Sequence, residues 1–182
     1  MPPGSERWPA FMRDQLLATL KPAGVLIPVI ERPAGLSVLL TQRSAELKHH
    51  AGQVSFPGGR MEDADRDIVH TALRETHEEV GIPPESITVI GYLQPMPTVT
   101  GYAVTPVIGL VAAAVSLDLD RTEVEYAFEV PLPFLLDRRN QRASEREFRG
   151  QTIPTVEFHY ENQQIWGATA HMLVELRKLL LK

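Results

Sequence analysis

The strongest chemical signal in this sequence is a group of three glutamates, Glu75, Glu78 and Glu79. On an α-helix each residue turns by about 100°, so Glu79 lies about 40° to one side of Glu75 and Glu78 about 60° to the other. The three carboxylates therefore share one helix face. Oxygen ligands of this kind suit a hard divalent cation such as Mg²⁺.

Such a cluster is unfavourable unless something binds to it. Like charges at these spacings repel by a few tenths of a kcal/mol per pair, and an anion in the last helical turn opposes the helix dipole by roughly 0.3–1 kcal/mol. Local conflicts of this type tend to mark functional sites. The alternative is a solvated acidic face, which is common on exposed helices. Gly58 and Gly59, just before the helix, favour a site because glycine lets the backbone approach a metal or phosphate closely.

The helix that must carry the glutamates is predicted over residues 66–80. One of Asp63, Asp65 and Asp67 can cap its first turn, and Gly81 with Pro83 ends it. Its apolar or small positions form a single stripe, which consists of Ile68, Val69, Ala72, Leu73, Thr76 and Val80.

The remaining sequence predicts an α/β fold with a mixed sheet flanked by helices. A helix from Pro9 to Leu20, ended by Pro22, forms an N-terminal extension over residues 1–22. β-rich runs at 23–30 and 36–40 predict a hairpin with its turn at 31–35. Further elements are a short strand at 53–56 before the break Pro57-Gly58-Gly59, strands at 87–93, 102–115, 123–130 and 153–160, and a closing helix at 167–181.

Composition narrows the classes of function. With 182 residues, 43% hydrophobic and 23% charged, the chain is expected to form a single domain over 1–182. The net charge of −5 leaves no basic field for a nucleic-acid backbone, and no apolar run is long enough to cross a membrane. The absence of cysteine excludes thiolate chemistry. A cytoplasmic enzyme for a small anionic substrate is the default expectation, and the oligomeric state is left open.

The segment from Gly59 to Ile82 resembles the Nudix box. Its second half reads Arg74-Glu75-Thr76-His77-Glu78-Glu79-Val80-Gly81-Ile82, which fills every charged and glycine position of that family's pattern, with Thr76 in place of an aliphatic residue. The first half is one position longer than the general pattern. The slot for an isolated acid therefore falls on Asp65 counted forward and on Arg66 counted backward.

The resemblance implies a Nudix-type α/β/α sandwich and a site in which Glu75, Glu78 and Glu79 bind Mg²⁺ or Mn²⁺. The carbonyl of Gly59 is a further candidate ligand, and Arg74 would pair with an acid to brace the loop. The catalytic group would comprise Arg74, Glu75 and Glu78. Water attack on phosphorus needs a base, which could be a box glutamate or one from the segment Glu123-Val124-Glu125.

Residues upstream of the box resemble the coenzyme A pyrophosphatase branch of the Nudix family. The pattern consists of Leu39-Leu40-Thr41-Gln42-Arg43-Ser44, then Lys48, Gly52 and Phe56-Pro57-Gly58-Gly59, with Lys48 where that branch has arginine. Lysine keeps the charge but loses the bidentate fork. The similarity continues to Glu129–Leu132 and Trp166–Ala170 and covers roughly residues 24–175.

This resemblance implies that Arg43, Lys48, Gly58 and Gly59 bind substrate, and that the substrate is coenzyme A or an acyl or oxidised form. The products would be adenosine 3′,5′-bisphosphate and 4′-phosphopantetheine-type compounds. The first alternative is a Nudix pyrophosphatase for another nucleoside diphosphate compound, such as ADP-ribose. The second is a non-catalytic Nudix-fold binding module, which losses among the box glutamates would favour, and none is lost.

Overall fold

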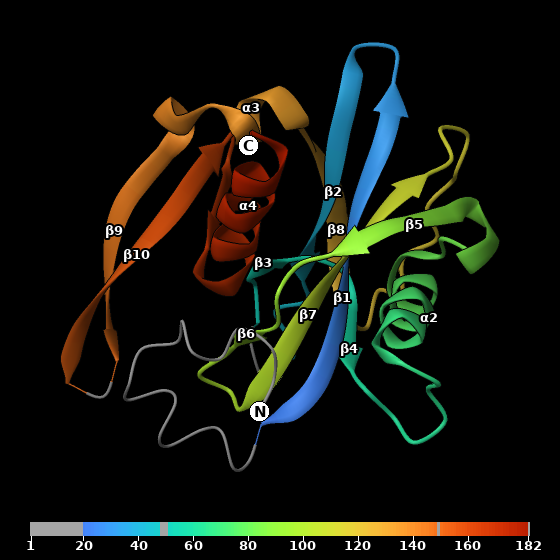
Figure 1. The fold of residues 1–182 in the computed structure, drawn as a ribbon, viewed down its shortest axis with the longest axis horizontal. Helices are drawn as coiled ribbons and strands as arrows, with labels where there is room; N and C mark the ends of the chain where they lie inside the picture. Colours follow the sequence, from blue (N-terminus) through green and yellow to red (C-terminus); the bar gives the residue numbers. More distant parts are fainter. Residues whose placement is uncertain (1–19, 48–50, 149, 182) are drawn as a thin grey trace.

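The computed structural model describes residues 20–47, 51–148 and 150–181 (Figure 1). Its centre is an eight-stranded sheet in which β1 pairs with β7 in parallel and with β2 and β4 in antiparallel orientation. The sheet is therefore mixed. Its strands are β1 (Lys21–Arg32), β2 (Gly35–Arg43), β3 (Val54–Ser55), β4 (Gly58–Arg60), β5 (Ile87–Tyr92), β6 (Met96–Pro97), β7 (Tyr102–Val111) and β8 (Val124–Pro131).

A second, antiparallel sheet has three strands in the order β11-β10-β9. These are β9 (Gln141–Phe148), β10 (Gln151–Tyr160) and β11 (Gln163–Trp166). The described helices are α2 (Ile68–Val80), α3 (Leu132–Leu136) and α4 (Gly167–Leu180), with short 3₁₀ turns η2 (Pro84–Ser86) and η3 (Arg138–Asn140).

Two hydrophobic cores lie on opposite faces of the large sheet because side chains alternate along β1. Leu26 and Ile30 belong to the core that includes Ala72 and Val80 of α2. Ile27 belongs to the other core, which the residues of α4 and the smaller sheet complete. Figure 1 accordingly shows α2 and α4 on opposite sides of the central strands. The predicted mixed sheet flanked by helices is confirmed.

Several predicted boundaries are corrected. The helix predicted over 66–80 begins at Ile68 because Asp67 is its N-cap. The hairpin turn predicted at 31–35 is tighter, since Arg32 already pairs with Gly35. The break predicted at residues 57–59 is wrong in part, because Gly58–Arg60 is β4 and pairs with β1. The strand predicted over 102–115 ends at Val111.

The predicted helix from Pro9 to Leu20 lies outside the described residues except for Leu20, which is not helical. Lys21 and Pro22, which were assigned to an N-terminal extension, instead begin β1. Within the described part of the chain, every helix is too short or too polar to cross a membrane.

Candidate functional site

The glutamate-bearing helix α2 is fixed at both ends. At its start, the Asp67 side chain accepts the backbone N–H of His70 at 2.8 Å. At its end, Gly81 adopts φ 73°, a left-handed conformation that glycine reaches without steric cost, and donates its N–H to the carbonyl of His77. Ala72 and Val80 of the apolar stripe are buried in the core beneath the sheet, so the core sets the orientation of the three glutamates.

Glu79 is the most buried of the three, with 3% of its side chain exposed. Its Oε2 accepts the backbone N–H of Gly58 at 3.1 Å, and its Oε1 lies 3.4 Å from Nη1 of Arg43. Burial raises the pKa of Glu79 to about 8, and the nearby charges of Glu123 and Glu75 act in the same direction. A divalent cation would relieve this crowding of negative charge.

Glu75 lies directly against the glycine loop. A Cβ on Gly59 would lie 2.4–2.5 Å from the Glu75 carboxylate atoms, so only glycine leaves this carboxylate its position. Burial raises the pKa of Glu75, although Nη2 of Arg74 lies only 3.0 Å from its Oε1. Gly59 was predicted to let the backbone approach a metal or phosphate; the group that lies close to it in the structure is the carboxylate of Glu75.

The acid that braces Arg74 is Asp65, which was one of the two positions left open by the sequence. Arg74 donates from Nε to Oδ1 and from Nη2 to Oδ2, both at 3.0 Å. Asp65 also accepts the Thr71 hydroxyl and the Glu62 backbone N–H, each at 2.9 Å. The guanidinium of Arg74 holds the pKa of Asp65 well below its usual range. Asp65 therefore stays ionised and ties the loop to the start of α2.

Glu78 is oriented differently from its two neighbours. Its side chain is 56% exposed, and its Oε2 accepts Nη1 of Arg74 at 2.9 Å. Within residues 20–47, 51–148 and 150–181, no three histidine or carboxylate side chains converge in metal-binding geometry. The oxygen donors of Glu75 and Glu79 and the loop cradle at Gly59 fit a hard cation. Glu78 would join them only after turning away from Arg74.

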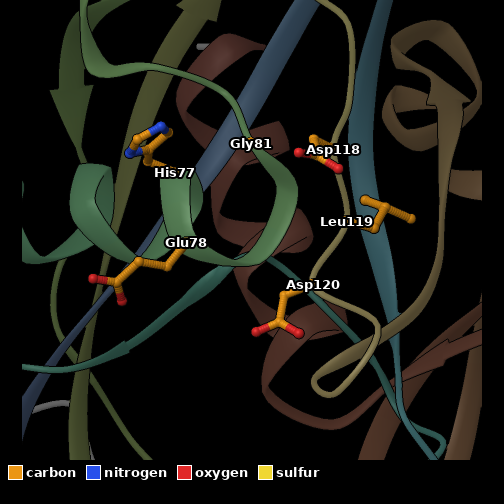
Figure 2. A pocket seen from close by; sticks show the side chains of 6 residues that line it. All are labelled: His77, Glu78, Gly81, Asp118, Leu119 and Asp120. Atoms are coloured by element: carbon orange, nitrogen blue, oxygen red, sulfur yellow. The ribbon is translucent and has the colours of Figure 1, made fainter.

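An open pocket of about 280 Å³ lies at the C-terminal end of α2 (Figure 2). It is lined by His77, Glu78, Gly81, Asp118, Leu119 and Asp120. The lining contains three carboxylates and no lysine or arginine, so it offers a diphosphate no positive charge of its own. We therefore do not assign the substrate to this pocket.

The loop that borders this pocket positions a fourth glutamate. The N–H groups of Asp118 and Asp120 donate to the carbonyls of Val80 and Glu79 at 3.0 and 3.1 Å, which caps α2. The loop then reaches Glu123, whose carbonyl accepts the Ser44 N–H at 2.8 Å. This capping was missed from the sequence, because it uses backbone groups that carry no residue signature.

Glu123 and Glu125 were both candidates for the base, and the structure places them differently. The charge of Glu123 acts on Glu75 and Glu79, raising the pKa of each. Glu125 is exposed and is not among the charges that act on either glutamate. Of the two, Glu123 is therefore the one whose charge acts on the glutamates of α2.

Three of the four predicted substrate-binding residues lie beside the glutamates of α2, and the fourth is not described by the structure. Strand β2 brings Arg43 to Glu79, and β4 brings Gly58 to the same carboxylate, so these residues meet at one point. Gly59 lies beside them against Glu75. Lys48 lies outside the described residues.

Comparison with known proteins gives one family. The pattern of the NUDIX domain matches residues 20–161. A protein of Escherichia fergusonii named "Uncharacterized Nudix hydrolase NudL" is 44% identical over 154 residues, which is 85% of this chain and 80% of that protein. A protein of the same name from Pectobacterium atrosepticum is 43% identical over 170 residues, covering 89% and 87% of the two chains.

Solved structures of similar fold are more distant in sequence. An Ap4A hydrolase from C. elegans, in a binary complex, aligns with a TM-score of 0.53 at 19% identity over 61% of this chain and 80% of that chain. The NUDIX domain of Shewanella oneidensis NrtR, complexed with ADP ribose, aligns with a TM-score of 0.50 at 20% identity over 64% and 76%. At these identities the likeness shows the fold alone.

Proposed function

This chain belongs to the Nudix hydrolase family, and from that premise we propose that it hydrolyses the diphosphate linkage of coenzyme A or of its acyl or oxidised derivatives. Nudix hydrolases generally use divalent cations such as Mg²⁺ or Mn²⁺. One observation carries the proposal. The segment that resembles the coenzyme A branch and the segment that resembles the Nudix box meet at Glu79, through Arg43 and Gly58.

In this proposal Glu75 and Glu79 hold the cation, and Glu78 joins them after leaving Arg74. The bound cation would polarise the diphosphate and lower the pKa of the attacking water. Arg74 is a positioning residue, because its contacts to Asp65 and Glu75 fix the loop and the carboxylate relative to each other. The presence of all three glutamates in the second half of the box argues against a non-catalytic binding module.

Glu123 is the proposed general base. It is half-buried, and its charge acts on both Glu75 and Glu79, the two carboxylates that would hold the cation. The water oxygen would bond to one phosphorus, and its proton would pass to Glu123. The bond between that phosphorus and the bridging oxygen would break, so that the bridging oxygen leaves with the other phosphate. For coenzyme A, the products are adenosine 3′,5′-bisphosphate and 4′-phosphopantetheine.

Arg43 and Lys48 supply positive charge for the phosphates in a protein whose net charge is −5. Coenzyme A carries a 3′-phosphate in addition to its diphosphate, so the proposal expects discrimination against 3′-dephospho-coenzyme A. A charge-assisted hydrogen bond to phosphate is worth roughly 1.5–3 kcal/mol, which corresponds to about tenfold or more in kcat/KM.

The test is a side-by-side measurement of kcat/KM on coenzyme A, 3′-dephospho-coenzyme A and ADP-ribose, with chromatographic identification of the products. Coenzyme A should be the best of the three. Lys48→Ala should reduce the discrimination if Lys48 contacts the 3′-phosphate, and Lys48→Arg should retain it. A higher kcat/KM for ADP-ribose would overturn the coenzyme A assignment and favour the alternative Nudix substrate.

A further inference from the structure

Arg43 contacts the oxygen of Glu79 that does not accept the Gly58 N–H. Its Nη1 lies 3.4 Å from Oε1, while the other oxygen, Oε2, already accepts the Gly58 N–H at 3.1 Å. A cation and a guanidinium brought to the same carboxylate oxygen repel each other strongly at a separation of a few ångströms. Cation binding at Glu79 therefore competes with Arg43.

The ion pair between Arg43 and Glu79 is weakly made for a buried one. Its 3.4 Å separation exceeds the roughly 2.7–2.9 Å of a good charge-assisted hydrogen bond, and it uses a single nitrogen where a bidentate fork is available. The Nε of Arg43 is buried and has no hydrogen-bond partner. A buried donor without an acceptor costs free energy. The guanidinium therefore lies beside Glu79 with its Nε–H lacking a hydrogen-bond acceptor.

The side chain of Arg43 is also accessible to other ligands. It is the last residue of β2, and 22% of its side chain is exposed, so the guanidinium is not sealed in the core. Glu79, by contrast, is fixed by α2 and by the Gly58 N–H. When the pair separates, Arg43 is the partner with freedom to move.

We propose that Arg43 is an exchangeable counter-ion. In the metal-free protein its guanidinium lies against Glu79; when a divalent cation binds Glu79, the released guanidinium donates to an oxygen of the substrate diphosphate. The inference rests on the proposed function, because it presumes cation binding at Glu79. It adds an order of events, in which the cation binds first and thereby frees the residue that holds the diphosphate.

NMR spectroscopy of the full chain separates the two events. The backbone amide of Gly58 reports on Glu79, and the Nε–Hε signal of Arg43, identified by its loss in Arg43→Lys, reports on the guanidinium. Mg²⁺ alone should shift both signals, and later addition of methylenediphosphonate should shift the Arg43 signal again. A Gly58 shift with no change at Arg43 would overturn the exchange and leave the metal site intact. If Mg²⁺ shifts neither the Gly58 nor the Arg43 signal, the proposed function itself is contradicted.

Affinity for methylenediphosphonate gives a second measurement. With saturating Mg²⁺, Arg43→Gln should raise its Kd by about tenfold, the loss expected for one charge-assisted hydrogen bond. Without metal, wild type and Arg43→Gln should bind it equally weakly, because Glu79 then retains the guanidinium. The matched control is Arg139→Gln, since Arg139 is 90% exposed and pairs with Asp137. An Arg43→Gln Kd within about twofold of wild type in Mg²⁺, or tight metal-free binding that needs Arg43, would refute the proposal.

Discussion

Replacement of Gly59 by alanine should separate folding from catalysis. The added Cβ would lie 2.4 Å from Cδ of Glu75 and 2.5 Å from both carboxylate oxygens, whereas ordinary contacts begin near 3.4 Å. The carboxylate must therefore retreat by about 1 Å, which its flexible side chain allows without disturbing the core. A misplacement of about 1 Å at a catalytic group costs on the order of 100-fold in rate. We expect kcat to fall by about that factor.

Two other glycine substitutions serve as controls for Gly59→Ala. At Gly58 a Cβ would lie 2.4 Å from the carbonyl oxygen of Gly24 and 2.5 Å from Cα of Val25, and φ is +152°. Backbone atoms cannot yield as a side chain does, so Gly58→Ala should lose about 2–5 kcal/mol of stability. At Gly91 a Cβ meets nothing within 4 Å, so Gly91→Ala should change neither property by much.

The assay for this series is kcat in millimolar Mg²⁺ together with the melting temperature of each variant. Gly59→Ala should melt within about 3 °C of wild type, because a tolerated glycine-to-alanine change alters stability by no more than about 1 kcal/mol. Near-normal turnover in Gly59→Ala would refute the assignment of Glu75. A melting temperature as low as that of Gly58→Ala would refute the claimed separation.

Three further outcomes are expected. Asp65→Asn should lower the free energy of unfolding by about 2–4 kcal/mol at pH 7, as measured by denaturant titration. Because the pKa of Asp65 is lowered in the folded protein, this difference from wild type should be constant above about pH 5 and should shrink as the pH falls below the unfolded pKa near 4. Glu123→Gln should reduce kcat by about 10²-fold or more at unchanged melting temperature, while the matched Glu125→Gln should stay within about twofold, and equal losses in both would contradict the choice of base. Mg²⁺ should raise the melting temperature of wild type but not of the Glu75→Gln, Glu79→Gln double variant, and equal shifts would place the cation elsewhere.

The elements that the sequence predicted well are those in which one strong pattern decides the outcome. Helix α2 carries a single buried stripe between an aspartate cap and Gly81, and the observed helix differs from the prediction by two residues at its start. The paired apolar runs of β1 and β2 were equally clear. In both cases local preference and the core agree, so the sequence needs no tertiary information.

The elements that were missed depend on partners distant in the chain. Strand β9 reads Gln-Arg-Ala-Ser-Glu-Arg-Glu-Phe, which has no apolar alternation, and it exists because β10 pairs with it along its whole length. Strand β4 is glycine-rich and forms only because Gly58 can approach Gly24 without a Cβ. Neither feature has a local signature.

The candidate site shows the same division. Helical spacing pointed to the three glutamates and the resemblance to the Nudix box pointed to Arg74, whereas the choice between Asp65 and Arg66 required the folded loop. The contact of Arg43 with Glu79 was not expected, because it joins the end of β2 to the end of α2 across 36 positions of sequence. Spacing along one element predicts a shared face, but only the packing of two elements shows which charges meet.

The most direct test of the central claim is product analysis of coenzyme A incubated with purified protein, with Mg²⁺ or with chelator, in wild type and in Glu79→Gln. We expect adenosine 3′,5′-bisphosphate and 4′-phosphopantetheine from wild type in Mg²⁺, neither product with chelator, and loss of most turnover in a folded Glu79→Gln protein. Turnover that survives chelation, or a Glu79→Gln protein with near-normal turnover at low Mg²⁺, would contradict a metal-dependent hydrolysis centred on this glutamate.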